Sequence, residues 1–583
     1  MKLILRYIKP YSLRIAVGML IKLLATLAEL MLPYILEHLI DEVVPLERIG
    51  KIVLWGILML ATAVLTRQLN VLANRRGVDN AHNISYNIRQ DLFHKTANLS
   101  GAQFDACGLP SLISRMTSDS YNVQSCVQAM QTICVRAPIL LLGGILVTLT
   151  MDLALASVLC VMLPVLLLVS VGVSRYGIPL YNKVQERLDD VVCIMRENIS
   201  GIRVIKALSK EPYEQNRFAA ANRTMAKSDI HASTVMALPS PAMQFCLNVG
   251  LTLVVLIGAM RVNNGQIKPG VILAFLTYFN MVLQGVMGLN RIFMMLSKAS
   301  ASAERIDRVL TLADGQKVLP ESATTPPAGE GFLRFEHVNF SYDPTCAEAG
   351  DSFRERGQCL YDISFSVKKG ESLGVIGPTG CGKTTIINLL MRFYDADSGA
   401  VYVDGRDVRC YPKDVLHKKF GVVFQNDMVF HNALRENIRF GRELTEDAVQ
   451  RAVLDAMAAE FVDELDGGLD YTAEIKGANL SGGQRQRVLI ARALAADPEI
   501  LVLDDSSSAL DYKTDAALRQ AIFENHSGAT ILLVAQRISS VQGMTHILVM
   551  DNGRCIGYGS HAELLQSCPA YREIYETQMG ELD

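Results

Sequence analysis

The sequence predicts an all-α transmembrane domain of six helices, followed by an α/β domain with a largely parallel sheet. Three observations support this fold class. Long uncharged stretches all fall before about residue 300. Beyond a segment rich in Pro, Gly and acidic residues, apolar strands alternate with helical patterns to the end of the chain, which is typical of α/β folds. A glycine-rich loop directly follows one of these strands.

Composition excludes several classes of protein. Of the 583 residues, 50% are hydrophobic and 20% are charged, whereas soluble proteins carry about 25% charged residues. Twelve cysteines are too few for a secreted disulfide scaffold. A net charge of −3 gives no basic footprint, so no nucleic-acid partner is expected. The composition favours a membrane protein with a large soluble portion, whose partners include the lipid bilayer.

The uncharged stretches match the length of membrane spans, which need about 20 largely apolar residues. The two shorter ones reach that length when flanking neutral residues are included. The first span is interrupted by Lys22 and Glu29, which are seven positions apart and therefore share one helix face. Charged groups inside a span are candidates for a functional role. The six spans are expected at residues 15–36, 52–66, 137–151, 153–174, 242–260 and 269–290.

Charge at the chain's start predicts its orientation. Four basic residues and no acidic residue precede the first span, which places the N-terminus in the cytosol. Six spans return the chain to the cytosol near Met295, and the long helical connections at about 75–130 and 175–240 fall on the same side. No small-residue cleavage site follows Lys22, so this segment is not expected to be removed. We expect a multi-pass protein of a cell membrane, of the bacterial inner or plasma membrane type.

The change in composition predicts the domain boundaries. Residues 311–330 are expected to form a linker between a transmembrane domain at 1–310 and an α/β domain at 331–583. The first strands of the second domain are expected at residues 332–340, 364–367 and 372–376.

The glycine-rich loop has the pattern GxxxxGK[ST] between a strand and a helix, which identifies the second domain as a P-loop NTPase. Its backbone N–H groups can surround phosphates, Lys383 can reach the β- and γ-phosphates, and Thr384 can ligate Mg²⁺. The expected cofactors are therefore ATP and Mg²⁺. The predicted ATP-binding residues of the loop are Gly377, Pro378, Thr379, Gly380, Cys381, Gly382, Lys383, Thr384 and Thr385.

Two later motifs complete a pattern. A buried strand ends at Asp504, as expected of the Mg²⁺-holding aspartate of a P-loop NTPase. The pentapeptide LSGGQ, ending at Gln484, lies between the phosphate loop and this strand. With these three motifs at this spacing, nearly the whole chain resembles the ATP-binding cassette exporters, in the half-transporter form that fuses six spans to one cassette.

The resemblance implies a site shared by two cassettes that close head to tail. Each ATP lies between one phosphate loop and the other cassette's LSGGQ, so this chain's signature residues contact the partner's ATP. Tyr342 resembles the aromatic that stacks on adenine, and Gln425 resembles the glutamine that links Mg²⁺ to the membrane domain. The implied metal ligands are Thr384, Gln425 and Asp504, and the implied signature residues are Ser481, Gly482, Gly483 and Gln484.

The membrane half carries two further likenesses to the family. Phe104 and Asp105, with residues 114–119, resemble its first cytosolic loop, and residues 197–206, continuing to Phe218, resemble its second. In the family, short helices in these loops transmit closure of the cassettes to the spans.

Two positions depart from the family pattern at the predicted catalytic residues. Asp505 stands where the family has the glutamate that orients water, and Gln536 stands where it has the switch histidine. Asp is one methylene shorter, and a misplacement of about 1 Å can cost about 10²-fold in rate. Gln cannot place a positive charge over the γ-phosphate. Family members with this pair are typically one half of a heterodimer, whose other half carries the Glu and the His.

Other departures leave alternatives open. The region after Tyr342 is longer than usual by residues 345–358, which hold or adjoin Cys346 and Cys359. These cysteines form either a redox clip or two reduced cytosolic thiols, and the second alternative is favoured. Ile475 replaces a glutamate before LSGGQ. Cys381 is expected to make the phosphate loop sensitive to thiol reagents.

The sequence therefore predicts ATP-driven export of a small amphipathic, lipid or peptide substrate by alternating access, with slow hydrolysis at the chain's own site. The alternatives are an exporter-shaped importer of an iron chelate, and a regulator or gated channel with slow ATPase activity. The motifs indicate the ATP-binding machinery and do not specify the substrate. Polar residues that are candidates to line its path are Lys22, Glu29, Arg67, Gln68, Asn70, Gln244, Asn248, Asn280, Gln284 and Arg291.

Overall fold

The computed structural model describes residues 2–323, 331–342, 358–506 and 509–579. The chain divides into two compact units. Unit 1 comprises Met1–His94 and Ile113–Leu312, and unit 2 comprises Lys95–Leu112 and Ala313–Asp583. The predicted insertion at 345–358, including Cys346, lies outside the described residues except for Gln358.

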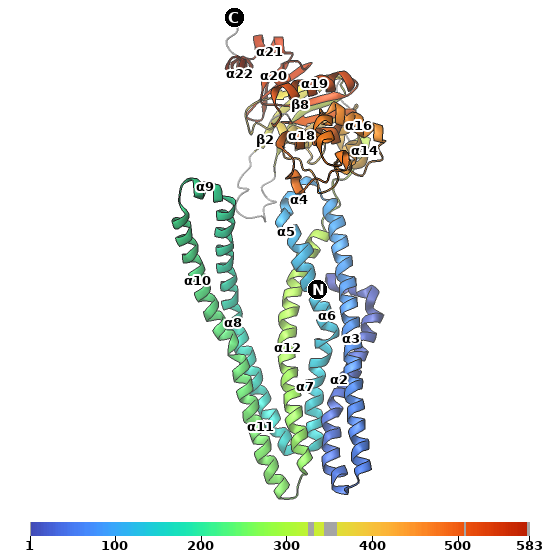
Figure 1. The fold of residues 1–583 in the computed structure, drawn as a ribbon, viewed down its shortest axis with the longest axis vertical. Helices are drawn as coiled ribbons and strands as arrows, with labels where there is room; N and C mark the ends of the chain where they lie inside the picture. The colour runs from blue at the N-terminus through green and yellow to red at the C-terminus, as the bar shows by residue number, and fades with distance from the viewer. Residues whose placement is uncertain (1, 324–330, 343–357, 507–508, 580–583) are drawn as a thin grey trace. The chain divides into compact units, whose positions relative to one another are not determined.

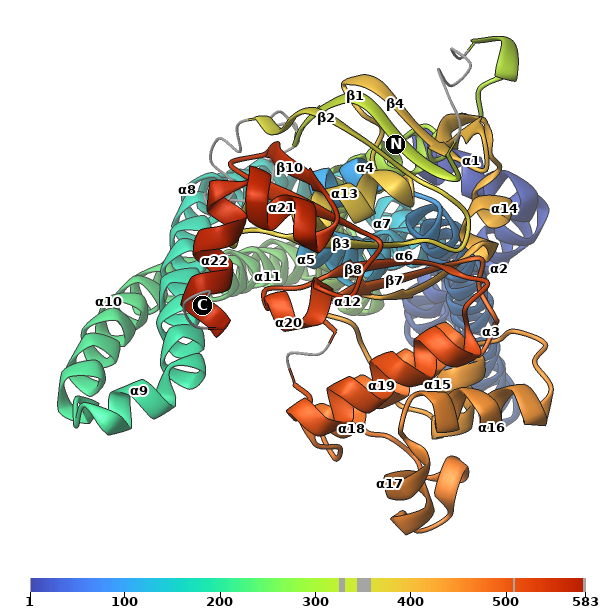
Figure 2. The same cartoon turned by 90° about the horizontal axis from the view of Figure 1, so that it is seen from above.

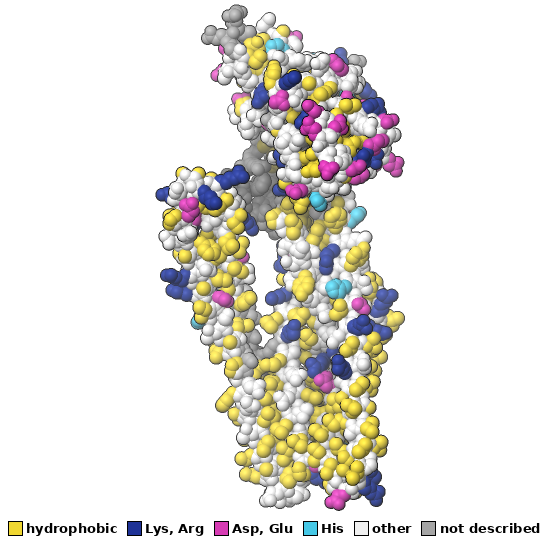
Figure 3. All heavy atoms as spheres, viewed as in Figure 1, with side chains coloured by type: hydrophobic (Ala, Val, Ile, Leu, Met, Phe, Trp, Pro, Cys, Tyr) yellow, Lys and Arg dark blue, Asp and Glu magenta, His cyan; other side chains and the backbone are white. Residues whose placement is uncertain are grey.

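Unit 1 is built from long helices (Figure 1), and on the face shown in Figure 3 hydrophobic side chains gather over their lower part. Among the described residues, five helical stretches are long and apolar enough to cross a membrane, and Leu153–Leu166 of α8 is a shorter apolar helix. A helical transmembrane region is thus confirmed, while the count of six spans stays a prediction. The helices are α1 (Lys2–Ile8), α2 (Ser12–His38), α3 (Ile49–Ala97), α5 (Leu109–Ser114), α6 (Ser120–Gln131), α7 (Ile133–Met151), α8 (Leu153–Ser200), α9 (Ile202–Ala207), α10 (Glu211–Ala237), α11 (Pro239–Asn263) and α12 (Pro269–Leu310).

Helix α12 forms the centre of the packing in unit 1. Phe275, Tyr278 and Phe279 on α12 are almost completely buried. The backbones of α12 and α7 approach closely at Gly288. A Cβ added at Gly288 would lie only 2.6 Å from the Cβ of Ala137 on α7. Small residues allow such close packing between membrane helices, where van der Waals contact drives association.

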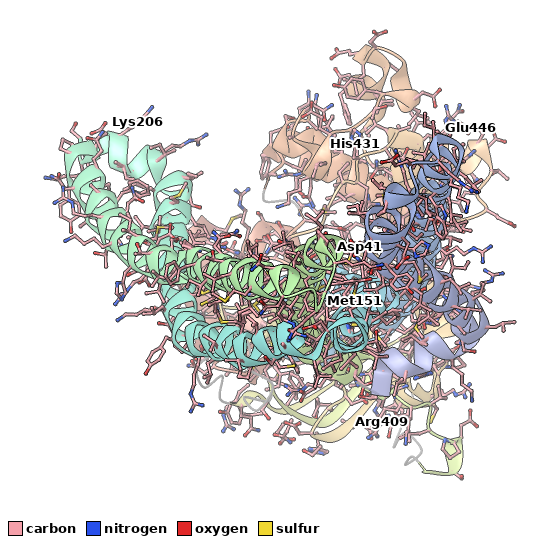
Figure 4. All side chains as sticks on the ribbon, turned by 90° about the horizontal axis from the view of Figure 1, so that it is seen from below. Asp41, Met151, Lys206, Arg409, His431 and Glu446 are labelled. Atoms are coloured by element: carbon pink, nitrogen blue, oxygen red, sulfur yellow. The ribbon has the colours of Figure 1, made fainter. Side chains whose placement is uncertain are left out.

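Two connections in unit 1 are helical extensions of the spans, as the sequence predicted. Helix α3 continues to Ala97, and α8 continues to Ser200 before the short helix α9 and the return helix α10. Helices α8 and α10 form a hairpin that leads away from the other helices of the unit (Figure 1). In the view from below, Lys206 on α9 lies far out along this hairpin, whereas Asp41 and Met151 project near the middle of the picture (Figure 4).

Unit 2 contains two β-sheets. One has four strands in the order β2-β1-β4-β5, and the other has six in the order β10-β9-β3-β8-β7-β6. Figure 2 shows β1, β2 and β4 on one side of β3, β8 and β7, and α15 and α17 on the other. The strands are β1 (Leu333–Ser341), β2 (Gln358–Val367), β3 (Ser372–Ile376), β4 (Ser398–Val403), β5 (Arg406–Asp407), β6 (Phe420–Val423), β7 (Ile500–Asp504), β8 (Thr530–Val534), β9 (His546–Asp551) and β10 (Arg554–Gly559). The helices are α4 (Gly101–Cys107), α13 (Lys383–Leu390), α14 (Lys413–Lys418), α15 (Leu434–Arg439), α16 (Glu446–Asp455), α17 (Ala459–Glu464), α18 (Gly482–Leu494), α19 (Tyr512–Asn525), α20 (Ile538–Val541), α21 (His561–Ser567) and α22 (Pro569–Met579).

Strand β2 is longer than the prediction of residues 364–367. It begins at Gln358 because its first half pairs antiparallel with the end of β1, as in the pairs Gln358 with Ser341 and Leu360 with Phe340. That half carries polar residues, so its strand character comes from the partner strand and not from a local apolar pattern.

Four parallel strands position the site. Strands β6, β7, β8 and β3 are neighbours in that order and run in the same direction. Their carboxyl ends therefore meet at one edge of the sheet, where ligands of α/β proteins bind.

Candidate nucleotide-binding site

The segments that leave these four strands line one cavity of about 620 Å³ in unit 2. The phosphate loop follows β3, Gln425 follows β6, Asp504 and Asp505 end and follow β7, and Gln536 follows β8. Residues separated by more than a hundred positions in sequence thus share one site. Its described lining residues are Asp105, Tyr342, Cys359, Thr379, Gly380, Gly382, Lys383, Thr384, Thr385, Asn388, Tyr394, Gln425, Asp504, Asp505, Val534, Ala535 and Gln536.

The phosphate loop needs its glycines for close backbone approach. A Cβ at Gly377 would lie 2.2 Å from the carbonyl oxygen of Met550, and Gly382 adopts φ +101° with Leu360 against it. Lys383 begins α13, and its Nζ donates to the carbonyl oxygens of Gly377 and Pro378, both at 2.8 Å. A helix N-terminus and an ammonium group therefore lie at the same end of the cavity, which favours phosphate binding.

The predicted metal ligands lie at the cavity wall. The Thr384 hydroxyl donates to Asp504 Oδ2 at 3.0 Å, and Gln425 lines the same cavity. Burial raises the pKa of Asp504, and the neighbouring charge of Asp505 adds to the increase. Hydroxyl, carboxylate and amide oxygens are hard ligands of the type that Mg²⁺ accepts. The residues present therefore fit a magnesium ion beside the phosphate loop.

The structure brings the two predicted catalytic residues together. Gln536 Nε2 donates to Asp505 Oδ2 at 2.9 Å. Asp505 has φ +48°, and its backbone N–H donates to the carbonyl oxygen of Val534 at 2.9 Å. The carboxylate beside the metal-ligand position is thus held by a neutral amide.

Tyr342 lies in an aromatic cluster at the wall of the cavity. Its ring is edge-to-face with Phe340 at 4.8 Å and with Tyr394 at 5.1 Å. Its hydroxyl lies 3.4 Å from Thr385 Oγ1 and accepts from Asn388 Nδ2 at 3.2 Å. These contacts fix the ring, so it can present an edge or a face to a base that enters the cavity.

Part of the first predicted cytosolic loop, Lys95–Leu112 with Phe104 and Asp105, belongs to unit 2 and reaches this cavity, whereas residues 114–119 belong to unit 1. The Gly101 N–H donates to the carbonyl oxygen of Phe393 at 3.1 Å, and the Tyr394 hydroxyl donates to Asp105. Asp105 also lines the cavity. A loop that follows a membrane-spanning helix in sequence is thus hydrogen-bonded to the wall of the nucleotide cavity.

The LSGGQ residues are arranged as a helix N-terminus elsewhere in unit 2. Ser481 Oγ accepts from the Gln484 N–H at 3.2 Å, and Gln484 Oε1 accepts from the Ser481 N–H at 2.9 Å, which is a capping box. Among the described residues that line the 620 Å³ cavity, none belongs to this motif. The structure does not bring it to the chain's own phosphate loop.

Gln578 on α22 is a residue that the sequence analysis missed. Its Oε1 accepts from the Ile538 N–H at 2.8 Å, and its Nε2 donates to the carbonyl oxygen of Gln536 at 3.0 Å. It thus holds the backbone on both sides of Arg537, directly after the cavity. No sequence signal could have found it, because the contact joins segments 40 positions apart and involves only backbone atoms of the loop.

Cys381 is less accessible than the sequence analysis expected. It is 4% exposed, and burial raises the pKa of its thiol. The thiolate is the reactive form of cysteine. With iodoacetamide near neutral pH, we expect Cys381 to be alkylated at least about tenfold more slowly than the exposed Cys193, as measured by peptide mass spectrometry. Equal rates in the folded protein would contradict this result.

Comparison with known proteins agrees with this geometry. Residues 15–287 match the family model of the ABC transporter transmembrane region, and residues 360–508 match that of the ABC transporter domain. The chain is 32% identical to the uncharacterized ABC transporter ATP-binding protein YfiB of Bacillus subtilis over 577 residues, covering 99% of this chain and 98% of YfiB. It is 30% identical to the putative ABC transporter ATP-binding protein exp8 of Streptococcus pneumoniae, covering 100% of this chain and 97% of exp8.

A solved structure of a bacterial Atm1-family ABC exporter with ATP bound has the same fold, with a TM-score of 0.80 and 22% identity. The match covers 98% of this chain and 99% of that one. Together with the phosphate loop and its surrounding cavity, these findings identify an ATPase-coupled, multi-pass membrane transporter of exporter fold. The chain belongs to the ABC transporter family and carries both the transmembrane region and the ATP-binding domain of that family.

Proposed function

We propose that this chain is the impaired half of a heterodimeric exporter: it binds ATP at its own phosphate loop but hydrolyses it slowly. The observation that carries the proposal is the hydrogen bond between Asp505 and Gln536 in the nucleotide cavity. These two residues occupy the positions where the resemblance predicts Glu and His.

The chemistry of this pair supports slow hydrolysis. The Asp505 carboxylate is one methylene shorter than Glu, and one of its oxygens already accepts from Gln536. The Asp505 carboxylate, as the general base, would lie farther from an attacking water than a Glu carboxylate would. One of its two oxygens would also be engaged by Gln536. The neutral Gln536 amide cannot supply positive charge where negative charge develops on the phosphate.

ATP binding, in contrast, has the residues it needs. The phosphate loop, Gly377 to Thr385, provides backbone N–H groups and the Lys383 ammonium, and Tyr342 would contact the base. Thr384, Gln425 and Asp504 would hold Mg²⁺, which offsets the negative charge of the β- and γ-phosphates when bound. ATP would therefore remain in this site and help to hold two cassettes together.

The signature motif supports a second cassette, and the Asp505–Gln536 pair supports one that differs from this chain. Ser481, Gly482, Gly483 and Gln484 form a capped helix N-terminus that is suited to an anion, and they do not line the cavity around Lys383 in the described structure. They would serve the ATP of a second half-transporter that carries the consensus Glu and His. Hydrolysis there would drive the transport cycle of both halves.

The transport reaction we infer is export of a small amphipathic, lipid or peptide substrate by alternating access. The N-terminus and the cassette would be cytosolic, with the chain in a bacterial inner or plasma membrane. The basic residues before the first span support this orientation.

Co-purification tests the proposal directly. The tagged chain should recover a second, non-identical half-transporter from membranes of its source cells, and the pair should hydrolyse ATP much faster than the chain alone. Vesicles that contain both halves should move substrate from the side of the membrane on which the cassettes lie to the opposite side. A homodimer of the unmodified chain that hydrolyses ATP as fast as the pair would overturn the impaired-site proposal.

Gln578 provides a milder test of the same site. Replacing it by Ala removes two hydrogen bonds to the loop that carries Gln536, and each such bond contributes about 1 kcal/mol. We expect the slow ATP turnover of the chain alone to fall a few-fold with little change in ATP affinity, because the variant loosens the loop that carries Gln536 whereas Gln578 itself does not line the cavity among its described residues. Thr577→Ala is a matched control, since its hydroxyl bonds within α22, to the Glu573 carbonyl oxygen. Equal effects of the two variants would exclude a positioning role for Gln578.

A further inference from the structure

Unit 1 contains a group of three charged side chains and one amide side chain on its long apolar helices. We call Lys22, Glu29, Arg136 and Gln284 the polar cluster; they come from α2, α7 and α12. Lys22 and Glu29 lie in the middle of α2, and Arg136 lies in the first turn of α7. Arg136 is therefore near the end of α7 that the topology prediction assigns to the cytosolic side, and the cluster extends from there to the middle of α2.

Lys22 is buried without a carboxylate in direct contact among the described residues. Only 5% of it is exposed, and its Nζ donates to Asn70 Oδ1 at 2.6 Å and Asn74 Oδ1 at 3.2 Å, both on α3. Amide oxygens solvate an ammonium group but do not neutralise its charge.

Arg136 is paired but remains accessible. Its guanidinium makes a two-point contact with Glu29, with Nη2 to Oε1 at 2.7 Å and Nε to Oε2 at 3.2 Å. The same Nη2 lies 3.2 Å from Gln284 Oε1. The Arg136 side chain is 36% exposed, so it can contact a further ligand.

The cluster therefore has an excess of positive charge. Lys22 and Arg136 contribute two positive charges, and Glu29 contributes one negative charge. Arg291 lies seven positions after Gln284 on α12, hence on the same face, and its side chain is exposed. Uncompensated charge inside a membrane region is costly, and intramembrane ionisable groups usually mark a substrate or ion path.

We propose that the polar cluster binds the anionic group of an amphipathic substrate, whose apolar part packs beside it. Met287, one turn from Gln284 on α12, is 41% exposed and offers a flexible apolar surface on a neighbouring turn of the same helix. This inference rests on the proposed transport function and narrows its substrate class to amphipathic anions.

Direct ligand binding tests the inference without ATP hydrolysis or a partner chain. The full-length chain in phosphatidylcholine nanodiscs would be titrated with a dansyl-labelled undecanoate and with the matched dansyl-labelled undecylamine. We expect saturable fluorescence enhancement with the carboxylate and at least about tenfold weaker binding of the amine, because charged hydrogen-bonded contacts give discrimination of this size. Inorganic phosphate should not displace the carboxylate probe, since it lacks an apolar part.

Charge variants give effects of opposite sign. Arg136→Gln should weaken binding of the carboxylate about tenfold or more, whereas Glu29→Gln should tighten it, because it removes the competing carboxylate. Arg261→Gln, which loses the same charge from an ion pair with Asp152 at 3.0 Å outside the cluster, should leave binding unchanged.

Three results would overturn the inference: equal or tighter binding of the amine, no tightening in Glu29→Gln, or displacement of the probe by phosphate alone. Glu29→Gln is expected to increase the affinity for the carboxylate probe, and a misfolded protein would not show such an increase. The inference can therefore be tested even if Arg136→Gln folds poorly. A negative result here leaves the Asp505–Gln536 proposal standing, because that proposal is tested by ATP turnover.

Discussion

Asp505→Glu combined with Gln536→His is expected to raise the ATP turnover of the purified chain about ten- to hundredfold. Glu would extend the carboxylate by about one C–C bond toward the position of an attacking water. His would replace the amide that now donates to Asp505 Oδ2 at 2.9 Å, and it can carry positive charge near the γ-phosphate. Steady-state phosphate release from the chain in nanodiscs measures the effect.

The two single variants separate the contributions. Asp505→Glu alone should give the larger part of the gain, because it restores the general base, and Gln536→His alone should give little while the short carboxylate remains. Asp463→Glu with Gln566→His makes the same chemical changes at exposed positions outside the cavity lining and serves as the control. A folded, ATP-binding double variant with unchanged turnover would show that these two positions do not limit hydrolysis.

Lys383→Ala is expected to weaken ATP binding about ten- to hundredfold. The Lys383 ammonium lies at the N-terminus of α13, where it donates to the carbonyl oxygens of Gly377 and Pro378, both at 2.8 Å. When ATP enters the unmodified chain, the ammonium can donate to phosphate oxygens in place of these neutral carbonyl oxygens. Lys383→Ala lacks the ammonium and therefore loses its attraction for the phosphates. Titration with a fluorescent ATP analogue measures the change in Kd.

Lys369→Ala is the matched control for this experiment. Lys369 precedes β3, whereas the phosphate loop follows it, so the two lysines lie at opposite ends of the same strand. Lys369 pairs with Glu499 at 3.4 Å on the surface, and such a pair contributes little to stability. ATP binding should be unchanged in Lys369→Ala. Equal affinities of Lys383→Ala and the unmodified chain would contradict the assignment of the phosphate loop.

Features that depend on contiguous residues could be predicted from the sequence. The phosphate loop is one such feature, because the strand, the glycines and Lys383 follow one another and form the anion site together. The apolar stretches of the spans are another, since span length is set by the bilayer. The strand that ends at Asp504 was also predictable, because an uninterrupted apolar run before a carboxylate is a local pattern.

Features that depend on partners distant in sequence could not be predicted in this way. Polar residues open β2 at Gln358, and they form a strand only because β1 pairs with them. Lys22 and Glu29 share a helix face, but only the packing of α3 and α7 against α2 gives one of them amide partners and the other Arg136. No sequence pattern indicated that Gln578 bonds to the loop that carries Gln536.

The sequence by itself determined which motifs this protein has: apolar stretches, a phosphate loop, a signature motif, and Asp and Gln at two positions where the resemblance predicts Glu and His. Only the tertiary structure decided that Asp505 and Gln536 bond to each other, that Lys22 donates to two asparagine side chains, and that Glu29 pairs with Arg136. The physical reason is the separation in sequence of the residues that interact. Local patterns record backbone preference and hydrophobicity, whereas the partner of a polar side chain depends on which helices and strands fold against it.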